Sequence, residues 1–419
     1  MLEKVRGPVS QKERGDHEGL VRVNLAIDAR GSIVSIIEGR DCDIEAARNG
    51  PNIDLDGRVV MTRLAELHTH IDKTQTWERA PNLDGSYNGA KAGAKSDRLQ
   101  SWSHEDAYRR MAFALASAYA HGTRSLRTHI DSQKKRTNPS WRVFDELRRE
   151  WAGRIQLQGV VSLGVGKIMG KYGDRIASLA QEYGAAFGPV IYPTSNQRAE
   201  ITRSFELAER YGLALDFHVD ETLDATANGL LNIADIALQR GFSGQVVCGH
   251  VCALSMKDDA EIKSILKRVR KANITIVSLP MTNLYLQDRD TGSAPIFRGA
   301  APMRAIVDAR VPLAVGGDNC RDAFHPYGDF DMVEVYREAV RIGHLDRPAG
   351  EYARCVSSIP EAAMGLSDPA IIARGALADL IVFSGRSLSQ VFTRLGAPRQ
   401  IICEGKPVIA PLPDFPITQ

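Results

Sequence analysis

The sequence predicts an α/β protein: a (β/α)8 TIM-type barrel with a small β-sandwich domain built from both chain ends. Strand-like apolar segments alternate with amphipathic helix-like segments through the middle of the chain, and eight such strands can be counted there. Both ends of the chain have short strand patterns bounded by Gly and Pro. At 419 residues the chain is longer than a single core usually supports, so one large domain and one smaller domain are expected.

The expected domains are residues 1–61 as the N-terminal part of the β-sandwich, 62–372 as the barrel, and 373–419 as the C-terminal part of the sandwich. Strand patterns near the N-terminus are short and too few to stand alone. The simplest architecture therefore brings the C-terminal strand patterns beside them.

The first barrel strand is expected within residues 59–73, which change from apolar to charged. Residues 81–95 are rich in Gly and Asn and are predicted to be a loop that covers the active site. A helix is then predicted from Ser103, because Asp106 follows three residues later, and Gly122 marks its end.

The following barrel strands are predicted by apolar runs that alternate with helical patterns. Their near-continuous apolar character is typical of parallel strands covered on both faces. The predicted segments are 125–131, 154–165, 185–193, 213–221, 245–251, 274–280 and 311–319.

Charge and composition favour a small-molecule substrate. The net charge is +2, with 53 basic and 51 acidic residues and no long block of like charge, so neither a nucleic-acid partner nor a membrane partner is expected. No apolar run approaches the roughly 18 residues of a membrane span, and the polar N-terminus predicts a cytoplasmic protein. Six scattered cysteines favour reduced thiols over a disulfide framework.

Polar residues gather at the predicted ends of the strands, where the chemistry of such barrels collects. These residues are His68, His70, His129, Asp131, His218, Asp220, Glu221, His250 and Asp318. Three histidines and one aspartate suit one divalent metal ion, Zn2+ or Fe2+, with a position left for water. The ion would lower the pKa of that water toward ~7.

Two further residues have predicted roles in proton transfer. Glu221 lies three residues after His218, beyond the strand end, and suits a carboxylate that takes a proton from the water and passes it to a substrate nitrogen. His250 is either a further ligand or a residue that holds the hydroxide by a hydrogen bond.

Several segments agree in order and spacing with a known family. They are HTHIDKTQTW from His68, FHVDE from Phe217, the Gly249-His250 pair, SLPMTNLYLQ from Ser278, and GGDN from Gly316 followed by PYGD. From roughly residue 60 to 410 the chain resembles the bacterial cytosine deaminase group of the amidohydrolase superfamily.

This resemblance implies one metal ion, often iron or zinc, bound by His68, His70, His218 and Asp318. It implies that Glu221 is the proton shuttle and that His250 positions the hydroxide and, with Asp318, takes part in catalysis. The lysine that bridges two metals in related enzymes has no counterpart at the end of the fourth strand.

Departures from the group concern the substrate. Val165 stands about where an amide would read a pyrimidine edge, and Asn319 follows the metal aspartate where another acid is expected. Lys73 replaces a threonine and is either a contact to a substrate oxygen or a surface lysine. Gln75 is a weaker candidate for ring recognition, and Tyr327 is a candidate for stacking on a planar ring.

The expected function is hydrolytic deamination of a small amino-substituted nitrogen heterocycle, with release of ammonia. The open alternatives are another ring, namely isocytosine, creatinine, pterin or a substituted triazine such as an N-alkylammelide, and a non-catalytic relative. The H-x-E and P-C-x-x-C signature of deaminases that act on nucleic-acid bases is absent from the sequence, which favours a free heterocycle. A homo-oligomer stays open.

Overall fold

The computed structural model describes residues 2–7, 15–38, 53–132, 139–289, 298–368 and 370–415. Within these residues eight strands form one parallel sheet, in which each strand lies beside the next one in the chain. This arrangement confirms the predicted barrel. Its strands are β6 (Leu64–Thr69), β7 (Thr123–Asp131), β8 (Gln156–Gly164), β9 (Ala186–Val190), β10 (Leu215–Val219), β11 (Val246–His250), β12 (Ile274–Ser278) and β13 (Leu313–Val315).

The sheet is nearly closed where the first strand meets the chain after the last one. Thr69 forms a parallel bridge with Asp318. The amide of Asp318 donates to the carbonyl of His68 at 2.9 Å, and the amide of His70 donates to the carbonyl of Asp318 at 3.2 Å. Closure of the barrel therefore brings the two predicted histidine ligands beside the predicted aspartate ligand.

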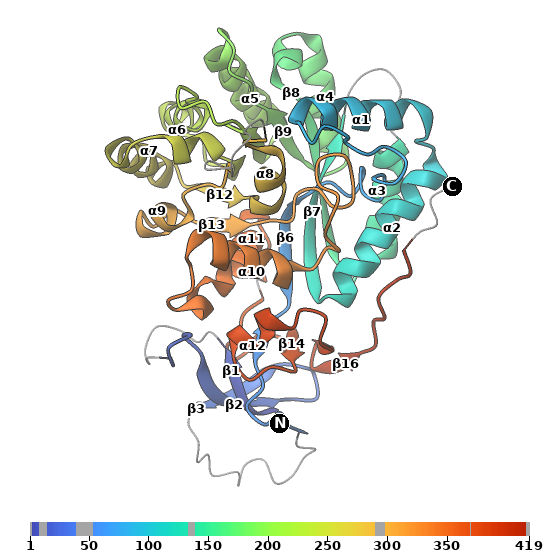
Figure 1. Cartoon of the computed structure of the whole chain (residues 1–419), viewed down its shortest axis with the longest axis vertical. Coiled ribbons are helices and arrows are strands. Elements are labelled where there is room, and N and C mark those ends of the chain that lie inside the picture. Colours follow the sequence, from blue (N-terminus) through green and yellow to red (C-terminus); the bar gives the residue numbers. More distant parts are fainter. Residues whose placement is uncertain are drawn as a thin grey trace.

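Helices surround the barrel (Figure 1). The predicted helix start at Ser103 is confirmed, because the Ser103 hydroxyl accepts from the amide of Asp106 at 3.1 Å at the beginning of α2. The α-helices that follow are α2 (His104–Ala120), α3 (Pro139–Glu150), α4 (Lys171–Glu182), α5 (Gln197–Tyr211), α6 (Gly229–Arg240), α7 (Asp259–Lys271), α8 (Pro280–Leu286), α9 (Met303–Asp308), α10 (Met332–Gly343), α11 (Ser358–Ala363) and α12 (Leu388–Thr393). Short 3-10 helices lie at η2 (Val165–Met169), η3 (Cys252–Met256) and η4 (Ala349–Val356).

The loop predicted at residues 81–95 is wrong for most of its length, because α1 (Tyr87–Gln100) is a helix. The Ser86 hydroxyl caps it by accepting from the amide of Gly89 at 2.9 Å. Gly93 faces the rest of the fold closely, and a Cβ there would lie 3.3 Å from the Cβ of Ala323. Tertiary packing therefore stabilises a helix whose Gly and Asn content disfavours it locally.

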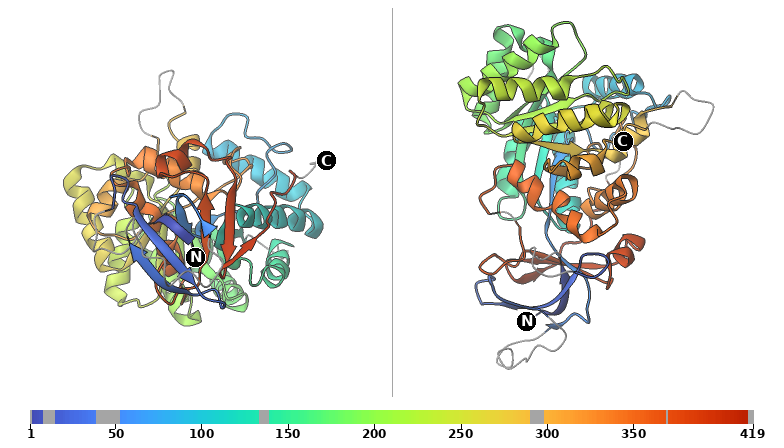
Figure 2. Two further views of the ribbon diagram at one scale, coloured as in Figure 1. Left: turned by 90° about the horizontal axis from the view of Figure 1, so that it is seen from below. Right: turned by 90° about the vertical axis from the view of Figure 1, so that its left-hand side faces the viewer.

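Two smaller sheets lie together at the end of the barrel where β6 begins, as Figure 1 and the right view of Figure 2 show. Within the described residues each has four strands, in the orders β3-β2-β1-β4 and β16-β15-β14-β5. Residues from both chain ends, including Val23, Val60 and Leu380, share one hydrophobic cluster. The strands are β1 (Leu2–Gly7), β2 (Val21–Ile27), β3 (Ile33–Glu38), β4 (Ile53–Asp54), β5 (Val60–Thr62), β14 (Leu380–Phe383), β15 (Arg399–Cys403) and β16 (Lys406–Val408).

The segment predicted as one strand at residues 59–73 is divided between two sheets. β5 pairs antiparallel with β14, and β6 enters the barrel after Arg63, whose amide donates to Asp379 at 2.9 Å. The domain boundaries at 61/62 and 372/373 stay predictions. None of the helices in the described part of the chain has the length and apolar character that crossing a bilayer requires.

Candidate metal centre and active site

Four buried side chains converge at the end of the barrel away from the smaller sheets. His68 and His70 lie at the end of β6, His218 lies in β10, and Asp318 follows β13. Nε2 of His70 lies 3.3 Å from Oδ1 of Asp318 and 3.3 Å from Nε2 of His218, and Nε2 of His68 lies 3.8 Å from Oδ1 of Asp318. These atoms face one small volume.

The unpaired nitrogen and oxygen atoms of these side chains suit a bound cation. Within the described chain, neither ring nitrogen of His68 and neither carboxylate oxygen of Asp318 has a hydrogen-bond partner of normal geometry. Burial, and after it neighbouring histidines or Lys73, hold the pKa of each of His68, His70 and His218 well below its ordinary value. The histidines are therefore neutral and offer lone pairs, as metal ligands must. Three imidazoles and a carboxylate suit one divalent ion.

His250 and Glu221 lie beside this cluster. Nδ1 of His250 lies 3.0 Å from the side-chain nitrogen of Asn283 and 3.6 Å from Oε1 of Glu221. The Glu221 side chain is 13% exposed. Burial, and then the charge of Asp318, raise the pKa of Glu221 to about 8. This carboxyl group can therefore both accept and release a proton near neutral pH.

Lys73 lies inside the site rather than on the surface. Its Nζ is 3.1 Å from Nδ1 of His70 and 3.2 Å from Oδ1 of Asp131, and its side chain is 10% exposed. Asp131 also binds Arg98 of α1. The ion pair between Arg98 and Asp131 thus connects α1 to β7. Lys73 lies between Asp131 and His70.

Gln75 and Asn319 take part in the structure of the rim. Oε1 of Gln75 accepts from Nε of Arg321 at 3.0 Å, and the side-chain nitrogen of Asn319 donates to Asp322 at 2.6 Å. Both side chains are buried. Their predicted contact with substrate stays a prediction.

Val165 and Tyr327 have contrasting surroundings. Val165 begins η2 and is fully buried in the main hydrophobic cluster. Tyr327 is 66% exposed, with its ring 5.7 Å from that of His325. An apolar side chain in the core offers no hydrogen bond to a heterocycle, and the predicted contacts of Val165 and Tyr327 with substrate stay predictions.

His129 is a site residue that the sequence-based set of ligands omitted. Its ring lies 3.9 Å from that of His68 and 4.6 Å from that of His218, and its Nε2 is 3.6 Å from Oδ1 of Asp216. Donor atoms of His68, His129 and His218 lie within 4.8 Å of one another. His129 lies two residues before Asp131 on the same strand face, and this spacing was the sequence signal that could have placed it in the site.

Tyr87 was missed because its segment was predicted to be a loop. It is the first residue of α1, and its hydroxyl donates to the carboxylate of Glu221. Ser86, followed by alanines at 90, 92 and 94, was the signal for a helix at this position.

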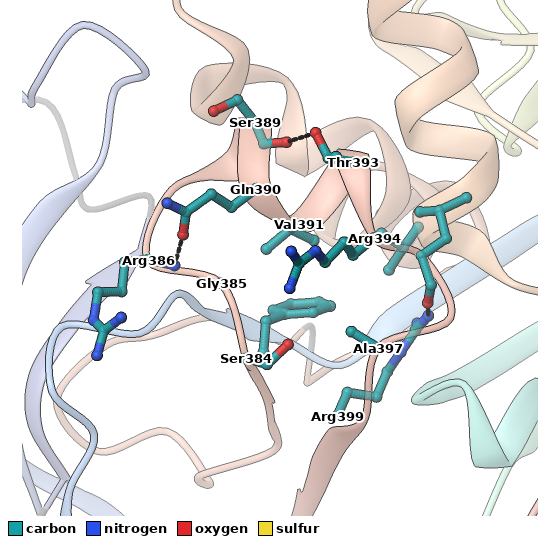
Figure 3. A pocket seen from close by; sticks show the side chains of 13 residues that line it. Ser384, Gly385, Arg386, Ser389, Gln390, Val391, Thr393, Arg394, Ala397 and Arg399 are labelled. Carbon is teal, nitrogen blue, oxygen red and sulfur yellow. Dashed lines mark hydrogen bonds between the residues drawn. The ribbon is translucent and has the colours of Figure 1, made fainter.

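A cavity of about 430 Å3 lies elsewhere, around α12 and the end of β14 (Figure 3). Arg394 points into it, whereas Arg399 is bound to Asp331. None of the predicted site residues lines this cavity in the described structure.

Known proteins are similar to this chain over most of its length. Residues 161–409 match the model of the amidohydrolase family. A pterin deaminase of Rhizobium rhizogenes (strain K84) is 39% identical over 400 residues, covering 95% of this chain and 90% of that protein. An N-isopropylammelide isopropyl amidohydrolase of Pseudomonas sp. (strain ADP) is 22% identical, covering 89% of this chain and 92% of that protein.

The fold also has a solved counterpart. The crystal structure of 5-methylcytosine deaminase from Klebsiella pneumoniae, liganded with 5-fluorocytosine, aligns with a TM-score of 0.81 at 23% identity and covers 98% of this chain and 97% of that one. The family match covers more than half of the chain, and the relative from Rhizobium rhizogenes covers nearly all of it. The chain therefore belongs to the amidohydrolase family.

Proposed function

We propose that this chain is a metal-dependent hydrolase that deaminates a heterocycle of the pterin class. The observation that carries the proposal is the meeting of Glu221 with the four donors His68, His70, His218 and Asp318 at one rim. The 39% identity to a pterin deaminase supports pterin over cytosine, because the cytosine-type structure is only 23% identical.

Glu221 and His250 have complementary tasks in this reaction. A divalent ion held by the four donors would supply water activated for attack, with its pKa lowered toward ~7. Glu221 accepts a proton from that water at its carboxylate, delivers it to a ring nitrogen, and then transfers the second water proton to the departing amine. The ring carbon keeps the oxygen of water as an oxo group, one water proton stays on the ring nitrogen, and the other leaves with the amine as ammonia.

His250 holds its proton on the nitrogen that faces the reaction. The amide nitrogen of Asn283 donates to Nδ1, which leaves the proton on Nε2. That Nε2 has no partner among the described residues. It can therefore donate to the oxygen that adds to the ring carbon and stabilise its developing charge.

We propose Zn2+ or Fe2+ as the ion, since both accept imidazole and carboxylate ligands. Metal analysis of the purified chain tests this, with about one ion per chain as the expected result. A cytoplasmic location and a homo-oligomeric state stay predictions.

Ammonia release from a panel of rings tests the function. The metal-loaded chain is assayed with pterin, cytosine, isocytosine, creatinine and N-isopropylammelide, and Glu221→Gln is the inactive control. The largest kcat/KM is expected for pterin, with ammonia and the oxo product formed in equal amounts. No ammonia from any ring would overturn the proposal, and a higher kcat/KM for another ring would reassign the substrate.

A further inference from the structure

Helix α1 carries aromatic and cationic side chains over the proton-transfer residue. Tyr87 opens this helix and belongs, with Phe324, to a small apolar cluster built on Ala90, Leu286 and Ala323. The rings of Tyr87 and Phe324 lie 6.0 Å apart, edge to face. The packed helix therefore holds Tyr87 in place beside Glu221.

A second tyrosine lies near Tyr87 but comes from another strand of the barrel. Tyr192 lies two residues after β9, and a Cβ on Gly164 would lie 3.4 Å from Cε2 of its ring. The ring of Tyr192 thus packs beside Gly164 at the end of β8. Cytosine-type enzymes have an amide near this point, where this chain has Val165.

The two phenols share a hydrogen bond above the carboxylate. Tyr87 lies beside both Glu221 and Tyr192, and its hydroxyl is the donor toward each of them. Tyr192 accepts from Tyr87, which leaves its own hydroxyl proton for another acceptor. Burial, and then the charge of Glu221, raise the pKa of Tyr192, so its hydroxyl stays protonated and can donate. Both tyrosines therefore lie close to Glu221.

Lys91 places a cation beside the rings of Tyr87 and Tyr192. Its Nζ lies 5.4 Å from the ring centroid of Tyr87 and 5.3 Å from that of Tyr192, one turn along α1. A cation at this distance from two phenol rings holds the rings together and makes their hydroxyl groups stronger donors.

We propose that Tyr192 is a specificity-determining residue that donates a hydrogen bond to an oxo oxygen on the substrate ring, while Tyr87 is the positioning residue of Glu221. When substrate enters, the Tyr192 hydroxyl donates its proton to a hydrogen bond with the ring oxygen, and Tyr87 stays beside Glu221. The substrate class is then an amino-oxo heterocycle, because a ring with an amino group in place of the oxo group offers no acceptor there. This inference rests on the proposed function.

Removal of one hydroxyl tests the inference on the full-length, metal-loaded chain. The selectivity measured is kcat/KM for pterin divided by kcat/KM for 2,4-diaminopteridine, in which an amino group replaces the oxo group. Tyr192→Phe is expected to lower this ratio about tenfold, because one hydrogen bond to the oxo oxygen is lost. A ratio within twofold of the parent chain overturns the proposal.

The control variants separate this role from a general loss of stability. Tyr108→Phe removes a phenol that donates to Glu150 at 2.6 Å on the exposed surface, and Lys95→Gln removes a cation one turn beyond Lys91. Both should leave the selectivity ratio unchanged, and metal content should match the parent chain in every variant. Lys91→Gln should lower the ratio in the same direction as Tyr192→Phe.

Equilibrium binding distinguishes failure of this inference from failure of the proposed function. If the parent chain releases no ammonia from any ring, the proposed function fails. The inference about Tyr192 is then tested by pterin binding, measured through the fluorescence of the ligand. Weaker binding by Tyr192→Phe, about tenfold, would still support the contact. Equal binding by the parent chain and the variant overturns it.

Discussion

The side-chain nitrogen of Asn283 lies 3.0 Å from Nδ1 of His250, where an amide N–H can donate to that ring nitrogen. Asn283 is held by α8, and His250 ends β11, so two neighbouring barrel units position one hydrogen bond. Both residues are buried, with exposed fractions of 1% and 2%. We propose from this contact that Asn283 is a positioning residue that acts through His250.

Loss of the Asn283 amide should reduce kcat more than it changes KM. Asn283→Ala frees Nδ1 of His250, so part of the population carries its proton there and cannot donate from Nε2. A decrease in kcat of about 10- to 100-fold is expected from steady-state kinetics. Asn232→Ala, which removes a donor to Gln197 at 2.9 Å outside the barrel, is the matched control. An unchanged kcat in Asn283→Ala would contradict the assignment.

Removal of a predicted ligand should remove the metal. Asp318→Ala is expected to retain less than about a tenth of an ion per chain by elemental analysis after dialysis. The parent chain should also unfold at a lower temperature once a chelator has removed the ion, because an ion at about 1,000 times its Kd stabilises the fold by about 4 kcal/mol. His104→Gln, which changes an exposed histidine paired with Glu146, should keep its metal.

The acid limb of kcat/KM should report Glu221. The residue must be ionised to accept a proton, so activity falls as pH falls through its pKa. Burial raises that pKa from 4.5 toward about 8, and a bound cation lowers it, which places the limb between these values. The bond from Tyr87 favours the ionised form, so Tyr87→Phe should move the limb to higher pH. A shift to lower pH in that variant would disprove the positioning role.

Arg127 should contribute strongly to stability. Its Nη1 donates to Oδ2 of Asp216 at 2.9 Å, and exposed fractions of 2% and 0% place both groups in the interior. Arg127→Met leaves a buried carboxylate without its cation, so urea denaturation should show a loss of about 3–5 kcal/mol. Arg268→Met, which breaks an exposed pair with Asp235, should cost at most about 1 kcal/mol.

This loss should depend on pH. Burial raises the pKa of Asp216 from 3.8 to about 6 in the folded chain, so the folded state binds its proton more tightly than the unfolded state. Stability from this group is therefore present below about pH 4 and is lost as pH rises through about 6. Without Arg127 the folded pKa rises further, so Arg127→Met should be more destabilised at pH 8 than at pH 5. Equal losses at both pH values would contradict this account.

The meeting of the four candidate metal ligands was predictable because strand geometry is local. His68 and His70 are two residues apart on one strand, so their side chains share a face, and His218 and Asp318 stand at the ends of other apolar runs. Parallel strands all end at one rim, so the pattern alone brings these residues together. The same logic predicted the barrel itself.

The positions of Tyr87 and Tyr192 beside Glu221 could not be predicted from strand patterns in this way. Tyr87 lies in a Gly-rich segment whose helix is stabilised by the packing of Ala90 against Leu286 and Ala323. Tyr192 lies beyond the end of β9 in a segment without a regular pattern. Their contact depends on how loops from distant strands pack, which hydrophobic periodicity does not encode.

The pairing of β5 with β14 has a consequence for synthesis of the chain. Thr62 leaves the ribosome more than 300 residues before Leu380, its partner in the sheet. At about 5–20 residues per second the earlier strand waits roughly 15 to 60 s for its neighbour. During that interval the apolar edge of the N-terminal strands is open to other chains, so a nascent polypeptide of this protein is expected to depend on chaperones until its last strands emerge.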